Sequence, residues 1–159
     1  MPIDNDVYLG NPNLKKANTQ IEYTEEQIIE FLRCKEDPVY FANNYMKIVS
    51  LDEGLVQFKP YDFQEKLITN FHENRFNICK MPRQTGKSTT SVAYLLHYCV
   101  FNDSVNIGIL ANKAATARDL LGRLQTAYEN LPKWMQQGII AWNKGSLELE
   151  NGSKILAAS

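Results

Sequence analysis

Apolar residues recur along this chain at a period of about 3.6 residues in several segments, and this period predicts amphipathic helices. The first predicted helix begins with a capping-box pattern formed by Thr24 and Gln27. A later one begins with Asp62 and Glu65 and is expected to bury the apolar residues Phe63, Leu67, Ile68 and Phe71. The predicted helices cover residues 24–36, 40–46, 62–71, 87–101 and 117–131.

Segments typical of β-strands lie between these helices. Residues 76–81 and 105–110 are short apolar runs on either side of the helix over 87–101, and residues 139–142 form a third run. Residues 47–59 are expected to form short extended pieces around a turn. The order from residue 76 onward is therefore β-α-β-α, which is typical of an α/β fold.

The last segment of the chain alternates in the manner of two half-buried strands. Leu147 and Leu149 alternate with charged residues, and residues 153–158 supply the second run. Asn151-Gly152 between them is the dipeptide preferred in two-residue type I′ turns. The pattern predicts a C-terminal β-hairpin.

Length and composition are those of one ordinary domain. The chain has 159 residues, of which 44% are hydrophobic and 22% charged. Residues 1–23 are polar and are expected to form a flexible arm, which leaves residues 24–159 as the folded part. The net charge is −1, and Lys and Arg are scattered along the chain. This segment is therefore not expected to bind nucleic acid through charge alone.

The cysteine content and the apolar runs limit the cellular compartment in which the protein is expected. Cys34, Cys79 and Cys99 are too few and too dispersed for a disulfide framework or a zinc site, so buried free thiols are expected. The start lacks a basic and apolar leader, and the densest apolar run, over 92–101, is too short to cross a bilayer. A cytoplasmic protein without a membrane partner is expected.

The loop before the helix over 87–101 is typical of a phosphate-binding loop. In such a P-loop (Walker A motif), main-chain N–H groups surround the phosphates, a lysine reaches the outer phosphates and a hydroxyl helps to hold Mg²⁺. Gly86, Lys87 and Ser88 occupy these three positions. Met81 replaces the usual first glycine, which leaves a solvated Gly-Lys turn as the alternative. The residues predicted to bind the nucleotide in this loop are Pro82, Arg83, Gln84, Thr85, Gly86, Lys87, Ser88 and Thr89.

Four segments form a more specific combination than the loop alone. They are Cys34-Lys35-Glu36-Asp37-Pro38-Val39-Tyr40-Phe41, Pro60-Tyr61-Asp62-Phe63-Gln64, Arg83-Gln84-Thr85-Gly86-Lys87-Ser88 and Trp142-Asn143-Lys144-Gly145-Ser146. Together they resemble the large terminase subunit of tailed bacteriophages, most closely that of the T-even-like myoviruses, over about residues 24–159. That subunit is the ATP-driven motor that packages DNA into a capsid, joined to a nuclease domain. The resemblance implies part of a P-loop NTPase sheet of the terminase and helicase type, with N-terminal helices and a C-terminal β-hairpin, and ATP and Mg²⁺ as cofactors.

The resemblance also assigns roles to individual residues. In the family, Arg-Gln stands before the x-Gly-Lys of the loop, which makes Arg83 a sensor or stabiliser of the γ-phosphate and a catalytic residue beside Lys87. Ser88 would be the Mg²⁺ ligand. Gln64 resembles the adenine-reading glutamine, with Phe63 offering a stacking face. The alternatives are an exposed loop arginine, and a plain helix in which Phe63 is core and Gln64 is solvated.

The carboxylates that hydrolysis needs are not visible in this sequence. A P-loop ATPase uses one to hold the Mg²⁺ shell and another to polarise the attacking water. Asp103 is rejected because it lies at the far end of the helix over 87–101, and Glu148 and Glu150 are expected to be solvated on the hairpin. In the family the Walker B strand and the nuclease domain follow later in the sequence. The chain alone is expected to bind ATP weakly without hydrolysing it, and its unpaired strand edges are expected to make it depend on a partner.

The partners are implied by the resemblance alone. They are the portal protein, the small terminase subunit and viral double-stranded DNA, at the portal vertex of the procapsid in the host cytoplasm. Apart from the resemblance, a separately encoded C-terminal half is a further candidate partner, with an interrupted gene product and an incomplete sequence as the alternatives. Two other functions stay open at this point. One is a portion of a helicase-like ATPase, and the other is a non-catalytic docking module that uses the helices over 24–46.

Overall fold

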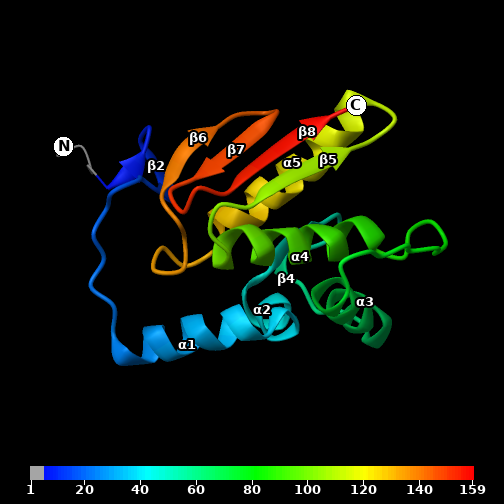
Figure 1. Ribbon diagram of the computed structural model, residues 1–159, viewed down its shortest axis with the longest axis horizontal. Helices are drawn as coiled ribbons and strands as arrows, with labels where there is room; N and C mark the ends of the chain where they lie inside the picture. Colours follow the sequence, from blue (N-terminus) through cyan, green and yellow to red (C-terminus); the bar gives the residue numbers. More distant parts are fainter. Residues whose placement is uncertain (1–5) are drawn as a thin grey trace.

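The computed structural model describes residues 6–159, which form a mixed α/β fold around one four-stranded sheet (Figure 1). The strand order is β5-β8-β7-β6, with β5 parallel to β8 and the other pairs antiparallel. The strands are β5 (Asn106–Leu110), β6 (Ile139–Trp142), β7 (Ser146–Leu149) and β8 (Lys154–Ala158). The predicted strands over 105–110 and 139–142 are therefore confirmed.

Helix α5 (Ala114–Glu129) packs along β5 and β8, and α4 (Lys87–Phe101) packs against α5 (Figure 1). Helices α1 (Glu25–Glu36), α2 (Pro38–Tyr45) and α3 (Asp62–Glu73) lie on the other side of α4, where α2 and α3 contact it. The core lies between these layers. Its largest fully buried side chains include Leu96 of α4, Leu121, Leu124 and Tyr128 of α5, and Leu147 and Leu149 of β7.

Hydrogen bonds between side chains and main-chain groups cap the starts of α1 and α3, and in α3 the capping residue differs from the prediction. The predicted capping box of α1 is confirmed, because Gln27 N–H donates to Thr24 Oγ1 and Thr24 N–H donates to Gln27 Oε1. In α3 the predicted capping role of Asp62 and Glu65 is wrong. The amide of Gln64 performs it instead, since Gln64 Oε1 accepts from the N–H of Tyr61 at 2.8 Å.

The C-terminal hairpin of β7 and β8 is confirmed, but its turn is not type I′. Such a turn needs positive φ at both central residues, and Asn151 does not have it, whereas Gly152 has φ of +83°. Leu149 and Ser153 close the hairpin, because Leu149 N–H donates to Ser153 O at 2.9 Å. The loop therefore has three residues and ends in a left-handed glycine, as in a G1-bulge hairpin.

Part of the segment predicted to be a loose arm is packed against the fold. Strands β1 (Val7–Tyr8) and β2 (Asn11–Lys15) pair with each other, and Leu14 lies in the core. Gln136 holds this segment, since its Oε1 accepts from the N–H of Lys15 and its Nε2 donates to Asn13 O. The loose-arm prediction is therefore wrong for these strands, and for residues 1–5 it lies outside the described residues.

The predicted strand over 76–81 is wrong. These residues belong to the connection between α3 and α4 (residues 74–86), which projects away from the sheet (Figure 1) and pairs with no strand of residues 6–159. The side chains of Phe76 and Ile78 are 83% and 99% exposed. Because a strand requires a neighbour to accept and donate its main-chain hydrogen bonds, an apolar run without one stays an irregular loop.

The cysteines divide into two environments. Cys34 and Cys99 are buried as predicted, and burial raises the pKa of each thiol to about 12. Cys79 is exposed in the α3–α4 connection, so its predicted burial is wrong. Across residues 6–159, no helix has both the length and the apolar character needed to span a membrane.

Candidate functional site

The predicted phosphate loop is a tight bend between the α3–α4 connection and the first turn of α4. Gln84 and Gly86 both have left-handed backbone conformations, with φ of +61° and +75°. Thr85 between them donates its hydroxyl hydrogen to Pro82 O at 3.0 Å. Two left-handed residues so close together curl the main chain, and successive N–H groups in such a curl form a concave site for anions.

Helix α4 begins directly at this bend. Gly86 is its N-cap residue, and its first main-chain bond runs from the N–H of Thr90 to Gly86 O at 2.9 Å. The N–H groups of Lys87, Ser88 and Thr89 precede that bond and have no intrahelical acceptor. Together with the positive end of the helix dipole they favour an anion at this point.

Lys87 folds back into the bend. Its ammonium donates to Met81 O at 2.9 Å and to Pro82 O at 2.5 Å. The positive charge is therefore held inside the curl by neutral carbonyl oxygens. A phosphate oxygen is a stronger acceptor for an ammonium than a carbonyl oxygen, so a phosphate entering the bend can replace these contacts.

Gln64 joins α3 to this bend. It is only 5% exposed, and its Nε2 donates to Thr85 O at 3.2 Å while its Oε1 accepts from the N–H of Tyr61. A Cβ at Gly86 would collide with Gln64 Nε2, so the contact needs a glycine at that position. The sequence assigned Gln64 only an adenine-reading role. No sequence signal relates it to Thr85, because the two residues meet only in the folded chain.

A cavity of about 800 Å³ opens beside the bend. Its walls come from the hairpin of β3 (Lys47–Ser50) and β4 (Gly54–Gln57), from the start of α3 and from the bend itself. Tyr61 and Phe63 stack on each other at this cavity, with ring centroids 5.8 Å apart and planes inclined by 11°. Phe63 is exposed and Gln64 is buried, which is opposite to the arrangement expected for a plain helix.

The structure gathers most of the predicted site residues in one region. Phe63, Gln64, Gln84, Thr85, Gly86 and Thr89 line the cavity. Pro82, Arg83, Lys87 and Ser88 lie on the adjoining bend and are not lining residues. Arg83 and Ser88 are exposed, and neither ion pair found in residues 6–159 involves Arg83. Their predicted roles in binding phosphate and Mg²⁺ stay predictions.

The carboxylates named from the sequence lie elsewhere. Asp103 follows the C-terminal end of α4, and a helix of 15 residues spans about 22 Å from the bend. Glu148 pairs with Lys154 at 3.3 Å, and Glu150 accepts from the N–H of Asn18 at 2.8 Å. The described part of the chain holds no cluster of three His, Cys, Asp or Glu side chains suited to a metal ion.

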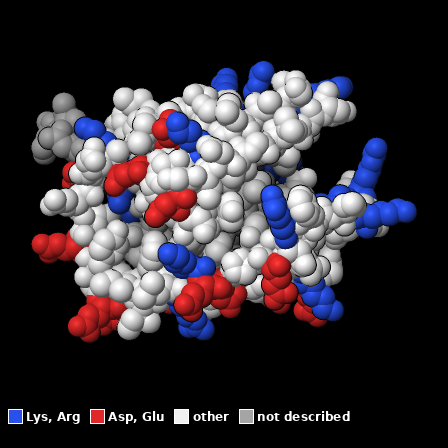
Figure 2. Space-filling view, in the orientation of Figure 1, with Lys and Arg blue, Asp and Glu red and all other residues white. Residues whose placement is uncertain are grey.

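The surface charge is mixed, as the sequence indicated, but one end stands out. Figure 2 shows Lys and Arg side chains gathered on the right, where the α3–α4 connection projects in Figure 1. The basic residues of this connection are Arg75, Lys80 and Arg83. An end that carries these cations beside the bend favours the approach of a phosphate group.

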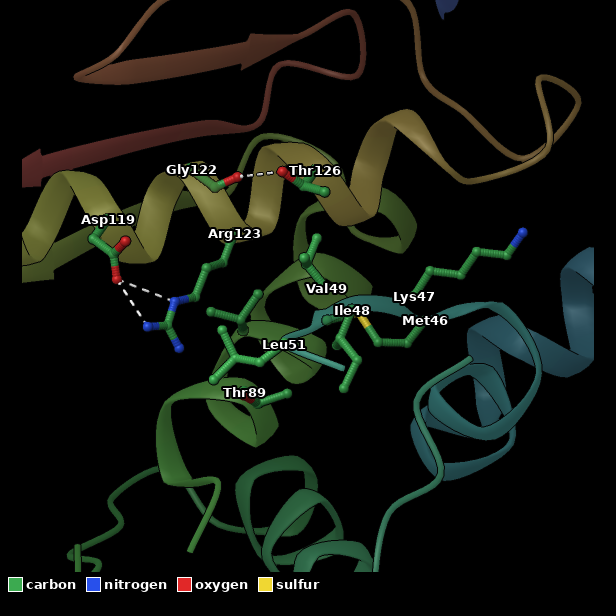
Figure 3. Close-up of a pocket in the computed structure, with 11 residues that line it drawn as sticks. Met46, Lys47, Ile48, Val49, Leu51, Thr89, Asp119, Gly122, Arg123 and Thr126 are labelled. Atoms are coloured by element: carbon green, nitrogen blue, oxygen red, sulfur yellow. Dashed lines mark hydrogen bonds and ion pairs between the residues drawn. The ribbon is translucent and has the colours of Figure 1, made fainter. Parts of the chain in front are cut away.

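A second cleft, of about 650 Å³, lies on the other side of the β3–β4 hairpin (Figure 3). Apolar side chains of β3 such as Val49 face α5 across it, where Arg123 and Asp119 form an exposed ion pair at 3.0 Å. The cleft shares Ile48 and Thr89 with the first cavity but includes no residue of the bend itself. The left-handed bend therefore adjoins the first cavity and not this cleft.

Comparison of the chain with known protein families gives a match over residues 78–159. The matched family is described as terminase large subunit, T4-like virus type, N-terminal region. The match covers α4, α5, the four-stranded sheet and the whole bend that surrounds Lys87.

Proposed function

The chain belongs to the T4-like virus type of the terminase large subunit family, in its N-terminal region, and from this we propose that it is the ATP-binding part of a motor that packages viral DNA. One observation carries the proposal. The Lys87 ammonium is folded into a left-handed bend at the N-terminus of α4, beside a cavity edged by two stacked aromatic rings. Such a bend followed by a helix suits a nucleotide whose phosphates bind at the helix terminus.

Each part of the site has a role in this proposal. The main-chain N–H groups of the bend bind the β- and γ-phosphates, and Lys87 exchanges its carbonyl contacts for phosphate oxygens. Ser88, in the first turn of α4, is the residue that would hold Mg²⁺, which neutralises phosphate charge when bound. Arg83 is exposed at the entrance of the bend and binds the γ-phosphate.

The base occupies the cavity beside the bend. Its volume of about 800 Å³ accepts a ligand of nucleoside size, and the Phe63 ring, stacked on Tyr61, offers a face for the base. Gln64 uses one of its two amide hydrogens and one oxygen lone pair within the protein. One donor and one acceptor remain, which match the edge of adenine.

Hydrolysis is assigned to the complete motor, not to this chain alone. The acidic residues considered from the sequence lie at the far end of α4 or are engaged on the hairpin. We assign the carboxylates that complete the site to another part of the large subunit. The further partners in this proposal are the portal protein, the small terminase subunit and double-stranded DNA, at the procapsid portal in the host cytoplasm.

Titration with a fluorescent ATP analogue and Mg²⁺ tests the proposal. We expect saturable binding that is competed by ATP and reduced at least tenfold in Lys87→Ala. Lys80→Ala is the matched control, since it removes an exposed lysine of the same connection. Equal affinity in wild type and Lys87→Ala, or no competition by ATP, would refute the proposal. Turnover by the isolated chain that is lost in Lys87→Ala would refute the assignment of hydrolysis to the complete motor.

A non-catalytic docking module is supported by one separate observation. Helix α1 exposes the apolar side chains of Ile28, Ile29 and Leu32 on its surface. In that case a packaging partner binds the chain with equal affinity in wild type and Lys87→Ala, and ATP has no effect on binding.

A further inference from the structure

The hairpin of β3 and β4 forms one wall of the cavity beside the bend and has a cleft behind it. Ile48 and Val56, which pair across the two strands, line the cavity. The cleft of about 650 Å³ separates the hairpin from α5 (Figure 3), and Leu51 at the turn is fully exposed. Because a two-stranded hairpin is only marginally stable by itself, its position depends strongly on the contacts that hold its open end.

Gln57 fastens this open end to α2. Its Nε2 donates to four carbonyl oxygens, those of Met46 at 2.8 Å, Asn43 at 3.1 Å, Phe58 at 3.2 Å and Ala42 at 3.3 Å. Ala42 and Asn43 are among the last four residues of α2, whose carbonyl oxygens have no partner within the helix. Within residues 6–159, Gln57 donates every hydrogen bond found between the hairpin and a helix.

The chemistry of this anchor requires a hydrogen-bond donor at the end of the side chain. An amide nitrogen carries two hydrogens, and the four oxygens share them. The orientation of the Gln57 amide is thereby fixed, since the reversed amide would bring its oxygen against four carbonyl oxygens. An apolar side chain of similar length would leave the end of α2 without its partner. An ammonium has three hydrogens and no acceptor, so a lysine can replace the amide.

The anchor lies at the start of the segment that carries the contacts proposed for the base. Residues 56–59 line the cavity, and the buried side chain of Phe58 follows Gln57 directly. Tyr61, Phe63 and Gln64 come next in the chain and line the same cavity. A shift at the open end of the hairpin therefore moves one wall of the cavity. The bend around Lys87 has its own contacts and does not depend on this anchor.

We infer that Gln57 is a positioning residue for nucleotide binding, which holds the β3–β4 hairpin on the end of α2 and so keeps the cavity at the width that the nucleoside requires. The inference rests on the proposed function, and Gln57 acts through the hairpin. The nucleotide binds tightly only to molecules whose hairpin is in place, so loss of the anchor lowers the apparent affinity in proportion to the fraction that keeps it. ATP and ADP lose affinity by the same factor, because the wall faces the nucleoside.

Two substitutions of Gln57 test this role by titration with the fluorescent ATP analogue, competed by ATP or by ADP. Gln57→Met removes the donor at a similar side-chain length and is expected to lower the affinity for both nucleotides about tenfold. Gln57→Lys restores a donor and is expected to bind within about twofold of wild type. Equal affinity in wild type and Gln57→Met would overturn the inference, as would equal losses in the two variants.

Asn44→Leu is the matched control. It removes another side-chain amide of α2, which donates to Tyr40 O at 2.8 Å on the exposed side of the helix and does not contact the hairpin. The affinity for the ATP analogue is expected to stay unchanged. A loss equal to that of Gln57→Met would assign the effect to α2 as a whole and would overturn the inference.

Amide hydrogen exchange measures the anchor separately from ATP binding. Gln57→Met is expected to speed exchange over 47–57 and to leave α4 unchanged, and unchanged exchange in the hairpin would overturn the inference. If Gln57→Met unfolds, wild type provides the measurement, because bound ATP analogue is expected to slow exchange over 47–57. A bound analogue that leaves the hairpin unprotected would overturn the inference alone. Absence of binding by wild type would overturn the proposed function and this inference with it.

Discussion

The substitution Gly86→Ala places a methyl group at the point where α3 meets the bend. Gly86 has φ of +75°, a conformation that costs an L side chain about 1–2 kcal/mol. The new Cβ collides with Gln64 Nε2, so the amide has to leave its contacts with Thr85 O and the N–H of Tyr61. At about 1 kcal/mol for each lost hydrogen bond, the free energy of unfolding falls by roughly 3–4 kcal/mol in total.

Urea unfolding of the four proteins of a double-mutant cycle measures this effect. Gln64→Ala alone removes the two hydrogen bonds of the Gln64 amide and is expected to lower the free energy of unfolding by about 2 kcal/mol. In that background Gly86→Ala meets no amide and costs only the backbone strain, about 1–2 kcal/mol. The free energy of unfolding of the double variant is therefore expected to be about 2 kcal/mol higher than the value obtained by adding the two single effects.

Gly122→Ala is the matched control. A Cβ at this position of α5 meets no atom within 4 Å, and the substitution is expected to stabilise the helix by about 0.5–1 kcal/mol. Additivity of the Gly86 and Gln64 effects to within about 0.5 kcal/mol would refute the reasoning. It would mean that the two residues do not share a contact in solution.

Three further predictions concern the γ-phosphate, the buried histidine and the N-terminal strands. Arg83→Ala is expected to lower the affinity for ATP about tenfold and to leave ADP unaffected, since only the γ-phosphate would lose a charge-assisted contact; equal losses for both nucleotides in calorimetric titration would count against its role. Burial lowers the pKa of His97 from 6.5 to about 4, so its contribution to stability is complete above pH 6.5 and is lost as the pH falls toward 4. The free energy of unfolding should fall by about 2 kcal/mol between pH 7.5 and 5 in wild type, and by less in His97→Gln; parallel pH profiles would contradict this. Leu14→Ala is expected to lower the free energy of unfolding, measured by chemical denaturation, by about 2–4 kcal/mol, and Leu9→Ala is expected to leave it almost unchanged. The reason is that the Leu14 side chain is 1% exposed and that of Leu9 is 88% exposed. Equal effects of the two substitutions would show that the N-terminal segment is a loose arm in solution.

The helices could be predicted because their signals are local. The period of apolar residues and the flanking Gly86 and Asn102 define α4, and the predicted bounds of 87–101 agree with the structure. The capping box of α1 is equally local, since it involves residues three positions apart. The bend around Lys87 was visible for the same reason, because its glycine and lysine are neighbours in the sequence.

The features that could not be predicted depend on residues far apart in the chain. Asn151-Gly152 predicts a type I′ turn when only the hairpin is considered. In the structure the Asn151 side chain donates to Cys99 O at 2.9 Å and to Asn102 O at 3.1 Å, at the C-terminal end of α4. These carbonyls have no partner within the helix, so the asparagine satisfies them and the turn takes another form. Hydrogen bonds to the end of α4 therefore outweigh the local preference of Asn-Gly for a type I′ turn.

The strand expected over 76–81 also depends on residues far away in the chain, and its absence bears on the bend beside it. Its composition favours a strand, but a helix satisfies its own main-chain groups whereas a strand needs a neighbour. The bend at Gly86 nevertheless keeps its curled form, because Gln64 and the start of α4 hold it from the other side. The proposed phosphate site and the pairing of the sheet edge therefore depend on different contacts. The form of the bend at α4 does not require a strand beside β5.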